Sequence, residues 1–114
     1  MPTIDSKQEQ VTVIVDTKFP GESHEKVLEI IQDSLKYFAK KKGFVSASIH
    51  VSREKGRLVN YLQWETFEDH LACANDPDWA KDCSELMNLL ESGEIQMDVQ
   101  VYDVVVCQEA SASP

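Results

Sequence analysis

The chain has 114 residues, of which 42% are hydrophobic, and it carries a formal net charge of −9 at pH 7. This length suits one domain with a real core, while the acidic balance argues against nucleic-acid binding, which clustered lysines and arginines drive. Because no apolar run could span a membrane and the polar start does not resemble a signal peptide, we expect a cytoplasmic protein without a membrane partner.

The number and spacing of the cysteines, together with the polar composition of the two ends, indicate how the chain is organised. An odd number of cysteines without Cys-x-x-Cys spacing favours reduced, partly buried thiols over a disulfide framework or a zinc site. The three are Cys73, Cys83 and Cys107. We therefore expect no metal. The polar ends predict a flexible arm over residues 1–9 and a disordered tail over residues 108–114, which leaves residues 10–107 as a single domain.

Alternating apolar residues predict a first strand over residues 11–19. A helix is predicted to follow, from an N-cap at Ser23 to Lys42, with Gly43 as its stop. One face of this helix is apolar and has to cover a sheet. The residues of that face are Val27, Ile31, Leu35 and Phe38.

Two further strands are predicted over residues 44–52 and 57–66. The residues between them, Glu54-Lys55-Gly56, suit a type I turn followed by a left-handed glycine, which would pair Arg53 with Arg57. Carried outward, this register predicts three cross-strand pairs on one face of the hairpin. The pairs are His50 with Asn60, Ser48 with Leu62, and Ser46 with Trp64.

The other face of the predicted hairpin is mostly apolar. Its residues are Val45, Ala47, Ile49, Val51, Val59, Tyr61 and Gln63. If helices cover only the face that holds Asn60, this second surface would be exposed at a size that soluble monomers rarely show. The simplest partner is another copy, packed sheet against sheet across a two-fold axis. We therefore predict a homodimer that forms through its sheet faces.

The C-terminal half predicts two helices and a last strand. A short helix, opened by a capping pattern, is predicted over residues 66–74, and a longer one over residues 77–92, which Gly93 ends. A strand is predicted over residues 94–107. The order strand, helix, strand, strand, helix, strand is that of a ferredoxin-like α+β fold with an antiparallel sheet.

The predicted face around Asn60 is unusually polar. Asn60 and Trp64 place an amide and an indole among leucines, and a buried amide offers up to four hydrogen bonds that need partners. The small side chains of Ser46 and Ser48 would leave volume that a close-packed core does not leave empty. These features predict a polar-walled pocket, with His50 in it. The alternative interpretation is an amide satisfied by core atoms beside an ordinary core tryptophan.

A resemblance to a known family supports the pocket. The pattern Asn60-x-x-x-Trp64 on the third strand, Lys42-Gly43-Phe44 entering the second, and a short helix directly after the tryptophan are similar to the antibiotic biosynthesis monooxygenase (ABM) domain family of dimeric α+β barrels. The similarity spans residues 11–106. It implies a homodimer that oxidises a quinol or a polycyclic, polyketide-like phenol with O2, without flavin, haem or metal.

The resemblance also implies roles for individual residues. In polyketide-tailoring members the motif Asn and Trp line the pocket beside a histidine of the second strand, which matches Asn60, Trp64 and His50, while His70 stands where an aromatic hydroxyl is common. Oxidation of a phenol needs a base, donors for the oxyanion and exclusion of water. We predict His50 or His70 as the base, unless His70 points to water, with Asn60 and Trp64 as donors. The predicted substrate contacts are Ser46, Ser48, Leu62 and Phe38.

Other classes of function stay open. A non-catalytic dimeric module that binds a small ligand is favoured by the missing aromatic hydroxyl and by the range of functions that one fold supports. An isomerase with a histidine base is a further alternative. Haem-degrading members of the superfamily use an Asn in the first strand and an axial His after the Trp, whereas this chain has no Asn in residues 11–19 and has Ala74 at the axial position.

Overall fold

The computed structural model describes residues 10–54 and 56–110. The predicted arm over residues 1–9 and the end of the predicted tail, residues 111–114, lie outside the described part. The elements in chain order are β1 (Val11–Lys18), the 3-10 turn η1 (Gly21–Ser23), α1 (His24–Phe38), β2 (Phe44–Val51), β3 (Arg57–Trp64), α2 (Phe67–Ala74), α3 (Asp78–Asp82), α4 (Ser84–Ser92) and β4 (Gln96–Asp103). Within the described ranges, no helix has the length and apolarity that crossing a membrane requires.

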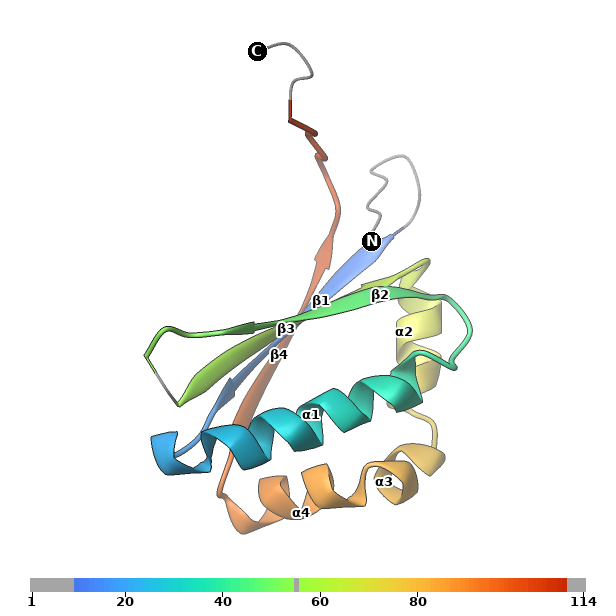
Figure 1. The fold of residues 1–114 in the computed structure, drawn as a ribbon. Helices are drawn as coiled ribbons and strands as arrows, with labels where there is room; N and C mark the ends of the chain where they lie inside the picture. Colours follow the sequence, from blue (N-terminus) through green and yellow to red (C-terminus); the bar gives the residue numbers. More distant parts are fainter. Residues whose placement is uncertain (1–9, 55, 111–114) are drawn as a thin grey trace.

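The strands form one antiparallel sheet in the order β2-β3-β1-β4, and the helices gather on one side of it (Figure 1). This arrangement confirms the ferredoxin-like α+β fold predicted from the sequence. β1 pairs with β3 on one side and β4 on the other. The faces of β1 follow the predicted alternation, since Val11 and Val13 are 2% and 3% exposed and belong to the core beneath the helices.

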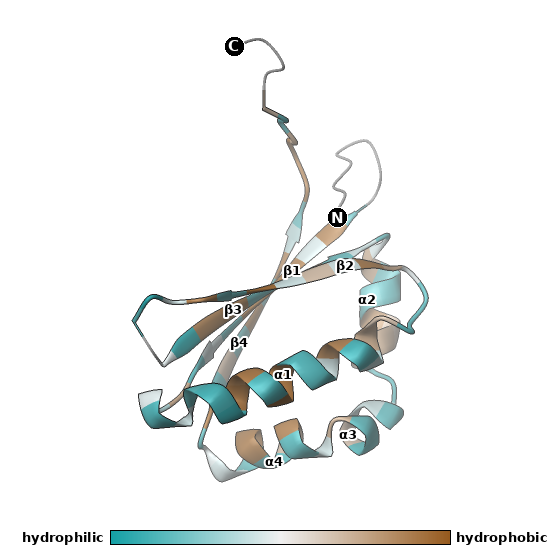
Figure 2. Ribbon diagram, viewed as in Figure 1, coloured by the Kyte–Doolittle hydropathy of each residue, from teal (hydrophilic) through white to brown (hydrophobic). Residues whose placement is uncertain are grey.

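α1 is shorter than the sequence predicted, because it ends at Phe38 rather than Lys42. Hydrophobic and hydrophilic positions alternate around it (Figure 2). The buried ones are Val27, Ile31, Ser34 and Tyr37. The chain turns after Ala39 so that the Gly43 carbonyl can accept a hydrogen bond from the Glu65 amide at 2.7 Å, which extends the pairing of the β2–β3 hairpin.

The second long helix of the prediction is broken in two. Cys83 has φ −118° and ψ 38°, outside the helical range, and it separates α3 from α4. The break changes the direction of the chain, so that Trp79 of α3 and Leu86 of α4 both line one cavity. Gly93, with φ +79°, ends α4 as predicted.

The last strand stops at Asp103, which pairs with Val11 at the start of β1, rather than at residue 107. One more backbone hydrogen bond follows, from the Val104 amide to the Gln10 carbonyl at 3.5 Å. Beyond the sheet, Val105 and Val106 are exposed by 81% and 76%. Residues 108–110 of the predicted tail are exposed and lack regular structure.

The β2–β3 hairpin does not have the predicted register. The Ser52 amide donates to the Arg57 carbonyl at 3.0 Å, so the loop comprises residues 53–56. The prediction paired Arg53 with Arg57 around a loop one residue shorter. Because side chains along a strand alternate between two faces, a slip of one residue turns the predicted inner residues of β2 outward.

The slip exchanges the two faces of β2. Ile49, rather than His50, lies opposite Asn60. A second irregularity, between Phe44 and residue 46, returns Phe44 to the inner face opposite Trp64. The residues that face away from the helices are Ser46, Ser48 and His50. Three of the residues predicted to line the pocket therefore belong to the open face of the sheet.

The same one-residue shift in register distributes the residues of the predicted second apolar face over both sides of the sheet. Ala47 and Ile49 pack against the core instead. Val59, Tyr61 and Gln63 remain on the face away from the helices. Gln63 is nevertheless only 4% exposed there, and Thr12 Oγ1 donates to its Oε1 at 3.1 Å. The open face is thus more polar than the sequence predicted.

Gly43 and Gly93 have similar backbone angles but different surroundings. Substituting each one therefore separates the cost of backbone strain from the cost of steric crowding. Gly43 has φ +83°, and a Cβ there would lie 2.5 Å from the Asp69 Cβ, whereas Gly93 has φ +79° with open space around it. We expect Gly93→Ala to lower the free energy of unfolding by about 1 kcal/mol. Gly43→Ala should lower it by about 1–3 kcal/mol more, since the start of α2 must shift. Urea denaturation measures both losses, and equal values would contradict the packing of α2 on Gly43.

Candidate functional site

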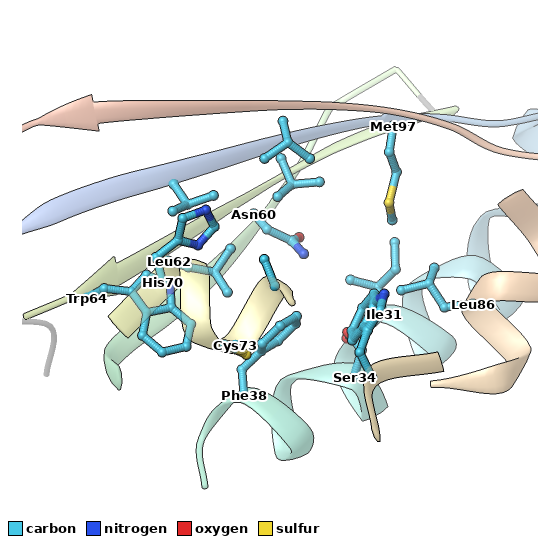
Figure 3. A pocket seen from close by; sticks show the side chains of 15 residues that line it. Ile31, Ser34, Phe38, Asn60, Leu62, Trp64, His70, Cys73, Leu86 and Met97 are labelled. Carbon is cyan, nitrogen blue, oxygen red and sulfur yellow. The ribbon is translucent and has the colours of Figure 1, made fainter. Parts of the chain in front are cut away.

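A cavity of about 200 Å³ lies between the sheet and the helices (Figure 3). Its walls come from β1, β3 and β4 on one side and from α1, α2, α3 and α4 on the other. Most lining side chains are apolar, as in small-molecule sites generally, and a few polar groups stand among them. The lining residues whose side chains carry a hydrogen-bonding group include Ser34, Asn60, Trp64 and His70.

Asn60 reaches the cavity because β3 alternates Leu58, Asn60, Leu62 and Trp64 on its inner face. Asn60 is 4% exposed, and its Oδ1 has no hydrogen-bond partner among the described residues. An unpartnered buried amide oxygen costs about 1–3 kcal/mol. The described protein atoms therefore do not satisfy the amide oxygen of Asn60, as the interpretation of Asn60 as an ordinary core amide would require.

Trp64 is 1% exposed, and its indole is held by aromatic edges. The Phe44 ring lies 5.4 Å from it and the Phe38 ring 6.5 Å, both edge to face. Its Nε1 has no acceptor among the described residues. The ring is thus fixed by packing, while its one hydrogen-bond donor stays free for another molecule.

His70 comes from the first turns of α2. Thr66 caps this helix, because its Oγ1 accepts from the Asp69 amide at 3.1 Å, as the sequence predicts. The His70 ring lies beside Trp64, tilted to it, with 6.1 Å between ring centroids. Burial lowers the pKa of His70 below its ordinary value, so the imidazole is neutral at pH 7. His70 lines the cavity and does not simply point to water.

The predicted site residues of β2 are elsewhere. Ser48 Oγ lies 2.9 Å from His50 Nε2, and the His50 ring packs against Tyr61 at 5.0 Å, all on the open face. Ser46 shares that face by alternation. None of the three lines the cavity, whereas Phe38 and Leu62 do. The longer hairpin loop is the physical reason for the difference.

Several other residues that line the cavity could not be recognised as such from the sequence. Trp79 and Met97 belong to predicted apolar stripes, which do not distinguish a cavity wall from a packed core. Ser34 uses its hydroxyl internally, because its Oγ donates to the Ile31 carbonyl at 2.6 Å. Burial raises the pKa of the Cys73 thiol to about 11, so this lining cysteine stays protonated.

This arrangement favours the chemistry of a neutral aromatic molecule. The cavity brings together the neutral imidazole of His70, the indole N–H of Trp64 and the amide of Asn60 among largely apolar walls. In the described ranges, no three His, Cys, Asp or Glu side chains cluster closely enough to hold a metal ion. An imidazole can accept a proton, and the amide and indole can stabilise an oxyanion.

Comparisons with known proteins agree with this geometry. No family model matches the chain. A stretch of 56 residues is 34% identical to tetracenomycin-F1 monooxygenase from Streptomyces glaucescens, covering 49% of this chain and 47% of that protein, so the match spans about half of the relative.

Solved structures share the whole fold. SnoaB, a cofactor-independent oxygenase from Streptomyces nogalater, superposes with a TM-score of 0.66 at 14% identity over 93% of this chain and 99% of its own. A candidate antibiotic biosynthesis monooxygenase from Deinococcus radiodurans gives a TM-score of 0.72 at 9% identity over 90% and 99%. The chain has the ABM fold. Its resemblance to ABM proteins, first stated on the residues around Asn60 and Trp64, is thereby confirmed.

The unpartnered amide of this ABM-fold chain predicts an unusual stability effect. Asn60→Leu should raise the free energy of unfolding of the ligand-free protein by about 1–3 kcal/mol, because it removes an unsatisfied buried group. The matched control is Gln63→Leu on the same strand. Gln63 is equally buried but paired with Thr12, so its loss should lower stability by about 1 kcal/mol. Urea denaturation compares the two, and a loss at both positions would contradict an unsatisfied Asn60.

Proposed function

We propose that this chain is a monooxygenase that oxidises a quinol or phenol with O2 in the cavity, and that it needs no cofactor. The observation that carries the proposal is the pair of buried, unpartnered polar atoms, Asn60 Oδ1 and Trp64 Nε1, in an apolar chamber beside a neutral histidine. The half-length match to tetracenomycin-F1 monooxygenase and the shared fold of SnoaB support it.

The first step is removal of a phenolic proton. His70 takes the proton, since among the described residues that line the cavity it alone carries a side chain that commonly serves as a general base near neutral pH. The substrate becomes an electron-rich phenolate, and the Asn60 amide N–H donates to its oxygen. The unpartnered Asn60 Oδ1 accepts from a second hydroxyl of a quinol. Apolar walls keep bulk water from quenching that anion.

The second step joins the anion to oxygen. A ring carbon bonds to one oxygen atom of O2, the O–O bond then breaks, and the second oxygen atom leaves as water with protons that came from the substrate. Quinol plus O2 gives hydroxyquinone plus water, so the quinol supplies all the electrons that reduce O2. The Trp64 indole N–H donates to the oxygen that becomes negative as the O–O bond breaks.

The proposal includes a homodimer in the cytoplasm. The helices leave the other face of the sheet uncovered (Figure 1), and Tyr61 and Tyr102 on that face are exposed by 39% and 51%. Face-to-face packing of two sheets would cover these rings. The thiols of Cys73, Cys83 and Cys107 are free, which suits a reducing compartment.

Oxygen uptake with a quinol panel tests the chemistry. Asn60→Ala should lower kcat/KM by about 100-fold, which is typical for loss of one oxyanion donor, and Trp64→Phe should lower it by about tenfold. His50→Ala should change it by less than about twofold, because His50 lies on the opposite face of the sheet.

The pH profile of the same reaction tests the base. Because the pKa of His70 is lowered, its neutral form persists at pH 7, and kcat/KM should fall only as the pH drops below about 6.5. In His70→Gln this acidic limb should disappear along with most of the activity. Tight binding of quinols without oxygen uptake would instead support the non-catalytic binding module.

The dimer has its own test. Sedimentation equilibrium of the wild type should give twice the monomer mass, and Tyr61→Glu should weaken the dimer by at least about tenfold in Kd, because a carboxylate would be buried unpaired. Lys36→Glu, on the exposed surface of α1, is the control and should leave association unchanged. A wild type that stays monomeric at all concentrations would refute this part of the proposal.

A further inference from the structure

The size of the cavity restricts the ligand. An engineered apolar cavity of about 150 Å³ holds benzene, while pockets for drug-sized molecules begin at about 300 Å³. The cavity of this chain, about 200 Å³, lies between the two. We infer that the site admits one or two fused aromatic rings, excludes three, and that Trp79 sets this limit. The inference rests on the proposed function, because it takes the ligand to be aromatic.

Trp79 forms part of the cavity wall and lies on a short helical segment. It belongs to α3, which spans Asp78–Asp82 between α2 and the break at Cys83. Its ring lies 5.2 Å from the Phe38 ring and 5.6 Å from the Tyr37 ring, so it packs as part of an aromatic cluster on α1. The side chain is only partly buried and lines the cavity on the helix side.

The position of Trp79 is fixed by Asp76. The Asp76 carbonyl accepts from the Trp79 amide at 3.1 Å, and its Oδ1 accepts from the Asp78 amide at 2.9 Å. The other carboxylate oxygen bonds Lys41 Nζ at 2.8 Å, and that ammonium lies 4.5 Å from the centre of the Tyr37 ring. These contacts tie α3 to the end of α1 and hold the indole against the cavity.

The centre of the opposite wall cannot provide extra room. It includes Val13 and Val15 on β1 and Asn60 on β3, and both strands are paired along both edges. Moving such a strand would break two ladders of hydrogen bonds. Met97 and Val99 lie on β4, which is an edge strand but is held to β1 along its whole length. The short α3 has no such ladder, so we expect a ligand larger than the cavity to displace Trp79, whose loss would open a space the size of its own two fused rings.

Affinities measured in the absence of oxygen test the limit on ring number, because no substrate can be turned over. We expect calorimetry to show that the wild type binds 2-naphthol at least tenfold more tightly than 2-anthrol. In Trp79→Ala, 2-anthrol should gain at least tenfold in affinity relative to 2-naphthol, whereas Trp79→Phe should keep the wild-type order. Leu89→Ala removes a buried side chain of α4 that does not line the cavity, and it should leave the ratio unchanged despite its cost in stability.

Each outcome decides the inference. A wild type that binds both ligands equally, or neither, overturns it, as does a ratio that Trp79→Ala leaves unchanged. If Trp79→Ala unfolds, Trp79→Leu keeps an apolar side chain against Phe38 and should shift the ratio in the same direction. Size selection without oxygen-dependent turnover of 1,4-naphthalenediol would refute the proposed oxidation while leaving the role of Trp79 intact.

Discussion

The structure depends on the pairing of β3 on both of its edges. Its register with β1 and β2 fixes every second residue toward the helices, so burial of Leu58 and Leu62 also brings Asn60 and Trp64 inside. The chain cannot bury the leucines and expose the amide. The consequence is that two buried polar atoms, Asn60 Oδ1 and Trp64 Nε1, have no hydrogen-bond partner in the described part of the chain. The stability of the fold and the polarity of the cavity thus come from one constraint.

The helices complete the site by packing rather than by hydrogen bonding. Phe38 of α1 and Phe44 of β2 fix the plane of Trp64, and α2, capped by Thr66, carries His70 beside it. Rigid neighbours of this kind hold donor groups in place before a ligand arrives, which reduces the reorganisation that binding requires. The proposed catalysis requires rigid donor groups on the β3 side of the cavity, whereas Trp79 on the α3 side limits the size of the ligand.

Much of the fold could be predicted from the sequence, because alternation in β1 and β3 and the Thr66 cap are local signals. The face of β2 could not, since Gly56 suits the end of a three-residue loop as well as of the observed loop over residues 53–56. One residue then decided whether His50 or Ile49 lies opposite Asn60. The role of Trp79 also could not be predicted, because a core stripe and a cavity wall have the same periodicity.

The unpartnered atoms of Asn60 and Trp64 connect the lifetime of the protein to the supply of its ligand. The empty chain carries an energetic penalty that a bound molecule with matching groups removes. A ligand present at one hundred times its Kd stabilises the folded state by about 2.7 kcal/mol. Cellular proteases degrade unfolded chains preferentially, so the protein should persist while its ligand is abundant and decline when the ligand is consumed.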